Sequence, residues 1–240
     1  MIKNTIEVCF APPLFPYLST KGPALYVIVD ILRATTSMSI AFHNGARKII
    51  PVADVDQARR YKDKGFLIAG ERDCRKVEGF DFGNSPFDFS PETVSGRTIA
   101  YTTTNGTQAI ELAKGSGDVM IAAFVNFTSS LNWILKQKRN TVILCSGWQN
   151  AFSLEDSVFA GALIENMLQS QNFETIGDSS IVSLELWKAS QPDYTSFLKQ
   201  ATHRERLTQY YREEEIDFCF LKDITTNIIV LKNGELLNIS

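Results

Sequence analysis

The chain has 240 residues, which is long enough for one substantial domain or two small ones with a buried core. Its 24 Lys and Arg against 27 Asp and Glu give a net charge of -3, so no basic surface is expected to neutralise a nucleic-acid backbone. With 44% hydrophobic and 21% charged residues, the composition is that of a folded globular protein and excludes intrinsic disorder.

Strands and helices are predicted to alternate along most of the chain. A buried strand is expected at 24–29, a β-branched apolar run that stops at Asp30, and a helix follows at 34–42. Further strands are predicted at 48–52, 66–69, 98–101, 119–123 and 142–145, with helices at 56–64, 105–114, 126–136 and 154–168. This order predicts an α/β fold, a three-layer α/β/α arrangement around a mainly parallel sheet.

Two regions depart from the alternation. Residues 71–96 are rich in Gly and Pro and carry several phenylalanines, so we predict a long ordered loop that covers or builds a site. The segment after 168 is more polar, with helices expected at 192–199 and 202–214 and a hairpin that turns at Asn233 and Gly234. We expect these C-terminal elements at the periphery.

The chain is interpreted as one α/β domain over 1–240, with two similar subdomains at about 20–96 and 97–240 as a variant. A possible internal repeat favours the division into two subdomains, since four residues recur at a constant interval. Ile40, Gly45, Ala53 and Val55 correspond to Ile110, Gly115, Ala123 and Val125. Both segments have the same predicted element order. A duplicated βαβ unit would place two loops that follow strands near each other.

No segment has the features of a membrane helix or a secretion signal. The longest apolar run, 119–125, is far shorter than the about 20 residues that a membrane helix needs. Asn4, Thr5 and Glu7 interrupt any signal-peptide core in the first ten residues. The four cysteines form no CxxC pair, which is typical of reduced thiols. We therefore expect a cytoplasmic protein without a membrane partner.

The first polar cluster follows the strand at 24–29. Asp30, Arg33, Thr35 and Thr36 combine a carboxylate that can hold a cation with a guanidinium that can bind an oxyanion. Ligands of open α/β sheets bind beyond the carboxyl ends of strands, which favours a site. The structural alternative is that a threonine caps the helix and Arg33 pairs with Asp30.

The second cluster follows the strand at 98–101. Thr103, Thr104, Asn105, Gly106 and Thr107 offer hydroxyls, a helix N-terminus and a glycine, which suit a phosphate or sulfonate. No Lys follows the glycine, so this is not a Walker A loop. A simple Thr or Asn helix cap remains the alternative.

Two further pairs complete the set of candidates, one of an acid with an arginine and one of two acids. Glu71 and Arg72 follow the strand at 66–69, and Glu155 and Asp156 begin the helix at 154–168, where capping by Ser153 alone would also explain them. Together with Asp30, these acids form the oxygen-rich, histidine-free ligand set that Mg²⁺ prefers.

Other phosphatase chemistries lack the residues they need. The two histidines, His43 and His203, have no paired or loop setting that predicts a histidine phosphatase or a zinc hydrolase. None of the cysteines has an Arg six positions later, as the cysteine phosphatase loop requires. Asp54 and Asp56 resemble the start of a haloacid-dehalogenase motif, but Ala58 departs from it and helix capping by Asp54 explains the pair.

At this point the motifs resemble those of a known family, the 2-phosphosulfolactate phosphatases. Five blocks match in order over roughly 27–162, and the chain departs from the usual pattern at Cys74 and Ser146, neither a proposed ligand. The matching blocks are IVDILRATTS from Ile28, GER from Gly70, GFDFGNSP from Gly79, YTTTNGTQA from Tyr101 and FSLEDSVFAGA from Phe152.

The resemblance implies an α/β/α enzyme that uses Mg²⁺ to convert 2-phosphosulfolactate to sulfolactate and phosphate, a step toward coenzyme M. It points to Asn84 and Ser85 in addition to the clusters above. We expect Asp30, Arg33, Glu71 and Arg72 to be catalytic, with a metal ion on some of the four acids. Substrate contacts are expected from Thr35, Thr36, Asn84, Ser85 and the residues from Thr103 to Thr107.

Several alternatives stay open from the sequence. Water is the expected nucleophile, and attack by Asp30 through a phosphoenzyme is the second route. A non-catalytic module that binds an anionic ligand, or a phosphatase for another phosphorylated hydroxy acid, would use the same loops. The sequence leaves a homodimer open.

Overall fold

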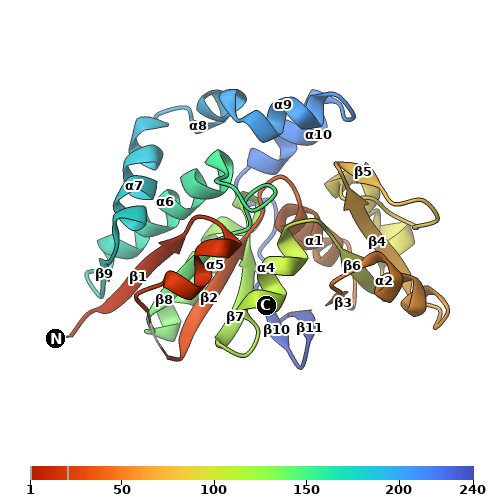
Figure 1. Cartoon of the computed structure of the whole chain (residues 1–240), viewed down its shortest axis with the longest axis horizontal. Helices are drawn as coiled ribbons and strands as arrows, with labels where there is room; N and C mark the ends of the chain where they lie inside the picture. The colour runs from red at the N-terminus through yellow and green to blue at the C-terminus, as the bar shows by residue number, and fades with distance from the viewer. Residues whose placement is uncertain (1, 21) are drawn as a thin grey trace.

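The computed structural model describes residues 2–20 and 22–240 and confirms the α/β fold (Figure 1). Its eleven strands in these ranges form one sheet, in the order β5-β4-β6-β3-β11-β10-β7-β2-β8-β1-β9. The strands are β1 (Asn4–Cys9), β2 (Ala24–Val29), β3 (Lys48–Pro51), β4 (Leu67–Arg72), β5 (Arg75–Lys76), β6 (Thr98–Thr102), β7 (Gly117–Ala122), β8 (Thr141–Cys145), β9 (Phe173–Thr175), β10 (Ile229–Lys232) and β11 (Glu235–Asn238).

Helices cover both faces of this sheet. The α-helices are α1 (Ala34–His43), α2 (Val55–Lys62), α3 (Pro91–Val94), α4 (Gly106–Ala113), α5 (Phe127–Gln137), α6 (Leu154–Gln169), α7 (Asp178–Ala189), α8 (Tyr194–Phe197), α9 (Thr202–Thr208) and α10 (Glu213–Asp217). Short 3-10 turns are η1 (Pro12–Tyr17), η2 (Pro86–Asp88), η3 (Phe124–Asn126), η4 (Leu198–Gln200) and η5 (Phe218–Phe220). Helices α5 and α6 belong to one apolar core and α1 and α4 to the other, which gives the predicted three layers.

Strand β2 shows why both faces need a cover. Leu25, Val27 and Val29 point into the core shared with α5 and α6, whereas Tyr26 and Ile28 point into the core shared with α1 and α4. Successive side chains of a strand alternate between the two faces, so a strand that is apolar at every position is stable only between two layers. Burial of this kind stabilises the fold by about 25 cal/mol per Å² of apolar surface.

The C-terminal hairpin was predicted correctly, but its position in the fold was not. Asn233 and Gly234 both have positive φ, as a two-residue hairpin turn requires. The hairpin is not peripheral: β11 pairs with β3 and β10 pairs with β7, so it joins two parallel blocks in the middle of the sheet. A local turn signal predicts a hairpin but carries no information on which strands it will pair with.

The two blocks run in opposite directions, because each of the three pairings through the hairpin is antiparallel. One block contains β3, β4 and β6, and the other contains β1, β2, β7, β8 and β9. Strand twist accumulates between them, and the loop after β6 lies against the loop after β2, with Gly106 beside Asp30. The site therefore forms where the blocks meet. A division into two similar subdomains near position 96 stays a prediction, although β6 pairs with β3 and β4.

Several boundaries differ from the prediction. Strand β4 continues to Arg72, so Glu71 and Arg72 belong to the strand and to a short hairpin with β5, not to a loop after it. Strands β1 and β9 and helix α7 were not predicted; the polar residues of β1 conceal its two buried apolar positions, Ile6 and Val8. The long loop is ordered by Phe80 and Phe89, which are buried.

The C-terminal helices α8, α9 and α10 run along one side of the molecule from α7 toward β5 (Figure 1). The Arg75 guanidinium of β5 donates to the Tyr210 hydroxyl after α9 at 3.1 Å, which connects the α9–α10 segment to β5. The 202–214 segment was expected at the periphery, but here it covers the loops at which the two blocks meet. No helix in the described ranges is long and apolar enough to cross a membrane.

Candidate functional site

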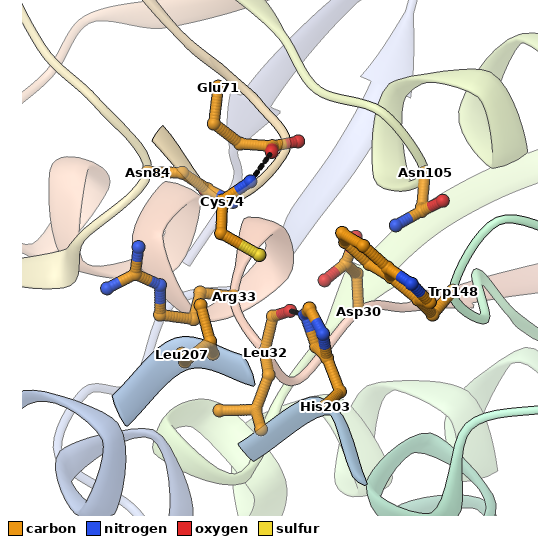
Figure 2. Close-up of a pocket in the computed structure, with 10 residues that line it drawn as sticks. All are labelled: Asp30, Leu32, Arg33, Glu71, Cys74, Asn84, Asn105, Trp148, His203 and Leu207. Carbon is orange, nitrogen blue, oxygen red and sulfur yellow. Dashed lines mark hydrogen bonds between the residues drawn. The ribbon is translucent and has the colours of Figure 1, made fainter. Parts of the chain in front are cut away.

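A small, buried cavity lies between the loops of the two blocks (Figure 2). Its volume is about 10 Å³, close to the space of one water molecule. The residues around it, drawn in Figure 2, come from six separate stretches of the chain. The lining residues are Asp30, Leu32, Arg33, Glu71, Cys74, Asn84, Asn105, Trp148, His203 and Leu207. We refer to it below as the inner cavity.

Asp30 is positioned by the loop between β2 and α1. Its Oδ1 accepts the Ala34 backbone N–H at 3.1 Å, while the Thr35 hydroxyl donates to the Asp30 carbonyl at 2.9 Å. The carboxyl is buried, and this burial, with the negative charges of Glu71 and Glu155, raises its pKa from 3.8 to about 7. A carboxyl with such a pKa is charged at pH 7 only in part unless a cation is present.

Gly106 gives the second loop its close approach to Asp30. A Cβ at this position would lie 2.8 Å from Asp30 Oδ2 and 2.7 Å from the Ala34 Cβ, which is closer than side chains pack. We predict that Gly106→Ala lowers the free energy of unfolding by about 1–3 kcal/mol, because neither backbone segment can yield easily. Chemical denaturation measures this change. Unchanged stability and activity in the variant would show that the two loops are not packed as described.

Arg33 is the largest fully buried side chain and has no acidic partner. Its guanidinium stacks on the Tyr211 ring at 3.6 Å, and its Nε and Nη1 groups have no hydrogen-bond acceptor. No carboxylate of the described residues lies within 4.0 Å of it, so the predicted alternative of an Arg33–Asp30 pair is wrong. A buried charge without a counter-ion is expensive, and the unused N–H groups mark a place for an anionic ligand.

Glu71 and Arg72 are neighbours with different surroundings. The Glu71 carboxylate lines the inner cavity and accepts the backbone N–H groups of Thr104 at 2.7 Å and Cys74 at 3.1 Å. Arg72 lies outside the lining; it donates to the Glu71 carbonyl at 2.6 Å and to the Thr102 hydroxyl at 3.0 Å. Successive strand residues point to opposite faces, which explains the separation. Arg72 therefore has structural contacts outside the inner cavity, and a catalytic role for it stays a prediction.

Most of the predicted hydroxyl ligands are used by the protein itself. The Thr35 and Thr36 hydroxyls donate to the carbonyls of Asp30 and Ile31, and those of Thr103 and Thr107 bond reciprocally to each other's backbone. The Ser85 hydroxyl caps η2 and donates to Glu215. Three predicted residues keep groups for a ligand: Asn84 and Asn105 line the inner cavity, and the Thr104 hydroxyl has no partner.

The two acids of α6 play different parts. Asp156 accepts the backbone N–H groups of Ile31 at 2.9 Å and Gly147 at 3.2 Å, and thereby holds the ends of two loops. Glu155 lines an outer cavity of about 300 Å³ that shares Trp148 and His203 with the inner one. Burial raises the pKa of both carboxyls, and their mutual repulsion adds to the rise at Asp156. Ser153 caps α6, as the structural alternative predicted.

The four acids predicted to hold Mg²⁺ are therefore only partly gathered. Asp30 and Glu71 share the inner cavity, Glu155 lies in the next cavity and Asp156 lines neither. Within residues 2–20 and 22–240, no group of three or more His, Cys, Asp or Glu side chains is arranged as a complete metal cluster. Asp30 and Glu71 could hold a cation together with water or ligand oxygens.

His203 and Trp148 belong to the site although the sequence did not point to them. Their rings stack with centroids 4.4 Å apart and separate the inner from the outer cavity. His203 Nε2 lies 2.8 Å from the Leu32 carbonyl, which can only accept, so Nε2 carries the proton and the unpartnered Nδ1 is a bare acceptor. Burial, with the charges of Arg206 and Arg33, lowers the pKa of His203 to about 4.

A sequence signal existed for only one of these residues. Trp148 follows strand β8, so the rule that ligands bind beyond the carboxyl ends of strands could have found it. His203 comes from α9, whose contact with the loop after β2 joins residues 171 positions apart. No local pattern predicts such a contact.

Fold and site together define an α/β protein with buried acids, a buried free guanidinium and amide donors around one small cavity. The family model described as 2-phosphosulpholactate phosphatase matches residues 14–234. The protein named probable 2-phosphosulfolactate phosphatase from Caldanaerobacter subterraneus subsp. tengcongensis is 37% identical to this chain over 212 residues, which cover 87% of this chain and 88% of the relative. The match in Thermotoga petrophila is 35% over 208 residues, with 87% and 89% covered.

A relative of the same name, from Picosynechococcus sp., is 35% identical over 206 residues, covering 84% of this chain and 85% of that one. The chain belongs to the 2-phosphosulfolactate phosphatase family. The resemblance predicted from five short blocks is confirmed, and it extends through the C-terminal third, where the sequence motifs were weak.

Proposed function

We propose that this chain is a phosphatase that hydrolyses 2-phosphosulfolactate to sulfolactate and inorganic phosphate with the help of Mg²⁺. The observation that supports it most is Arg33, which lines the same cavity as Asp30 and Glu71 and whose guanidinium is buried without an acidic partner in the described residues. Membership of the family and the printed names of its relatives point to the same activity.

The inner cavity is the proposed place of the phosphoryl group. Arg33 would donate from Nε and Nη1 to phosphoryl oxygens, and its charge would oppose the negative charge that these oxygens share during transfer. The side-chain amides of Asn84 and Asn105 are further donors there. Hydrogen bonds that exist before the reaction cost no reorganisation when the transition state forms.

The donors present fit a Mg²⁺ ion that is bound by few protein ligands. Asp30 and Glu71 bring two buried carboxylates to one cavity, and burial together with the charge of Glu71 raises the pKa of Asp30, a rise that a bound cation would offset. Mg²⁺ is commonly held by one or two carboxylates together with water and phosphate oxygens. When bound, it would polarise the phosphoryl oxygens and neutralise charge that develops on them.

The hydrolysis breaks the bond between phosphorus and the ester oxygen and forms one between phosphorus and a water oxygen. We propose water as the nucleophile, oriented by a carboxylate of the inner cavity, with Asp30 as the direct nucleophile in the second route. One proton of the attacking water ends on the ester oxygen, which leaves as the alcohol of sulfolactate, while the water oxygen stays on phosphorus. The space of about 10 Å³ holds no phosphoryl group, so Trp148, His203 or Leu207 has to shift when substrate enters.

The place of this reaction on the way to coenzyme M, and a cytoplasmic location, stay predictions from the sequence. The alternative from another class is a module that binds a phosphorylated acid without turnover.

Phosphate release separates these alternatives. The purified chain is incubated with 2-phosphosulfolactate, 2-phospholactate and a simple phosphomonoester, each with Mg²⁺ or with EDTA. Release from 2-phosphosulfolactate that requires Mg²⁺ and exceeds release from the others supports the proposal. Absence of release from every substrate would favour the binding module. Equal rates with Mg²⁺ and with EDTA would show that the reaction does not need Mg²⁺.

A further inference from the structure

We infer that Arg206, in the outer cavity, binds the acidic group of the substrate that is not transferred, a sulfonate or carboxylate. This inference rests on the proposed function. It assigns an anion subsite to a residue that no sequence motif contains and that lies outside the inner cavity.

The outer cavity adjoins the inner one. Its volume of about 300 Å³ is enough for a small organic acid, and the stacked rings of Trp148 and His203 form the wall between the two cavities. The lining residues of the outer cavity are Trp148, Ala151, Phe152, Ser153, Leu154, Glu155, Gln200, Ala201, Thr202, His203 and Arg206. A ligand whose phosphoryl group occupies the inner cavity would extend past these rings into the outer one.

Arg206 supplies the positive charge of the outer cavity. Its guanidinium lies over the Trp148 ring, 5.1 Å from the centroid, and is partly exposed. Across the described residues, no carboxylate lies within 4.0 Å of it and no hydrogen-bond acceptor is assigned to it. Stacking on an aromatic ring fixes the plane of a guanidinium while its N–H edge stays available.

The neighbouring arginines show that this state is particular to Arg206. Arg204, two positions earlier in α9, is buried and paired with Asp217 at 2.9 Å, and Arg212 pairs with Glu215 at 3.4 Å. Glu155 lines the same cavity as Arg206 but forms no ion pair with it. The N–H edge of Arg206 is therefore available to an added anion, whereas Arg204 and Arg212 are already paired with carboxylates of the protein.

The geometry matches the charges of the proposed substrate. In 2-phosphosulfolactate one carbon carries both the phosphoryl group and the carboxylate, and the next carbon carries the sulfonate, so one molecule would present one anion to Arg33 and another to Arg206. Only the phosphoryl group reacts. Arg206 would thus bind ground state and transition state alike, and its loss should raise KM more than it lowers kcat.

The test compares Arg206→Gln with wild type on four substrates: 2-phosphosulfolactate, 2-phospholactate, O-phosphoisethionate, which has the sulfonate but no carboxylate, and ethyl phosphate, which has neither. A loss of a charge-assisted hydrogen bond predicts a fall in kcat/KM of about 10- to 100-fold on substrates that keep the bound group, mostly in KM. Ethyl phosphate should change by less than about 3-fold. The two singly substituted substrates identify whether the group is the sulfonate or the carboxylate.

The controls are Arg206→Lys, which keeps the charge and should recover part of the affinity, and Arg212→Gln, which removes an exposed charge from the same segment and should leave all four rates unchanged. Equal losses on all four substrates, or no loss on any, would overturn the inference. If the wild type turns over none of them, the proposed function fails, and calorimetry with sulfolactate decides the subsite. Binding at least 10-fold weaker in Arg206→Gln supports it; equal or absent binding rejects it.

Discussion

Arg33→Met is expected to lower kcat by at least about 10³-fold while leaving folding stability unchanged or higher. A guanidinium that stabilises a transferring phosphoryl group contributes about 10³- to 10⁵-fold in comparable reactions. The stability result follows from a different property: Arg33 is 1% exposed and has no acidic partner, so the folded protein carries the full cost of burying its charge. Methionine keeps much of the volume without the charge.

The matched control is Arg72→Met. Arg72 donates to a backbone carbonyl and to the Thr102 hydroxyl and does not line the cavity, so its loss should cost about 1–3 kcal/mol of stability and reduce activity far less than the loss of Arg33. Steady-state kinetics and thermal unfolding measure both effects. If the two variants lose activity equally, or if Arg33→Met fails to fold, Arg33 does not have the role given to it here.

Asp30→Asn is expected to abolish turnover and to stabilise the protein increasingly as pH rises from about 4 to 7. The folded protein holds a proton on Asp30 up to a pKa of about 7, whereas the unfolded chain releases it near 3.8. The folded state therefore binds more protons between these values, and wild-type stability falls as pH rises through this window. Asparagine has no charge to bury, so the variant does not share this loss.

Thermal unfolding of both proteins at pH 5 and pH 8, in EDTA and then with Mg²⁺, measures the effect. The gap in Tm in favour of Asp30→Asn should widen at pH 8 in EDTA and narrow when Mg²⁺ stabilises the wild type. Asp54→Asn, an exposed helix cap outside the site, should retain full activity. A gap that is the same at both pH values would show that Asp30 is not the buried acid described here.

The sequence predicted the layers and the inner acidic residues because both have local causes. Apolar strands that end in polar residues, such as Val29 followed by Asp30, mark a buried strand and its functional loop in a single stretch. For the same reason the helix at 154–168 and its Ser153 cap were predicted almost to the residue.

The wrong or missing parts depend on contacts between distant residues. The position of the C-terminal hairpin in the sheet, the bond from the Ser85 hydroxyl to Glu215, and the entry of His203 into the site all join segments whose contact no periodicity encodes. Arg72 illustrates the finer limit: a strand that continues three residues further than predicted turns one side chain away from the cavity that its neighbour Glu71 lines.

A crystal structure of the wild-type protein with Mg²⁺, phosphate and sulfolactate is the sharpest test of the roles proposed for Arg33, Asp30 and Glu71 in the inner cavity. We expect phosphate in an enlarged inner cavity, hydrogen-bonded to Arg33, with Mg²⁺ held by a phosphate oxygen and the carboxylates of Asp30 and Glu71. Phosphate and metal bound elsewhere, with Arg33 still buried and unpaired beneath a closed cavity, would contradict it.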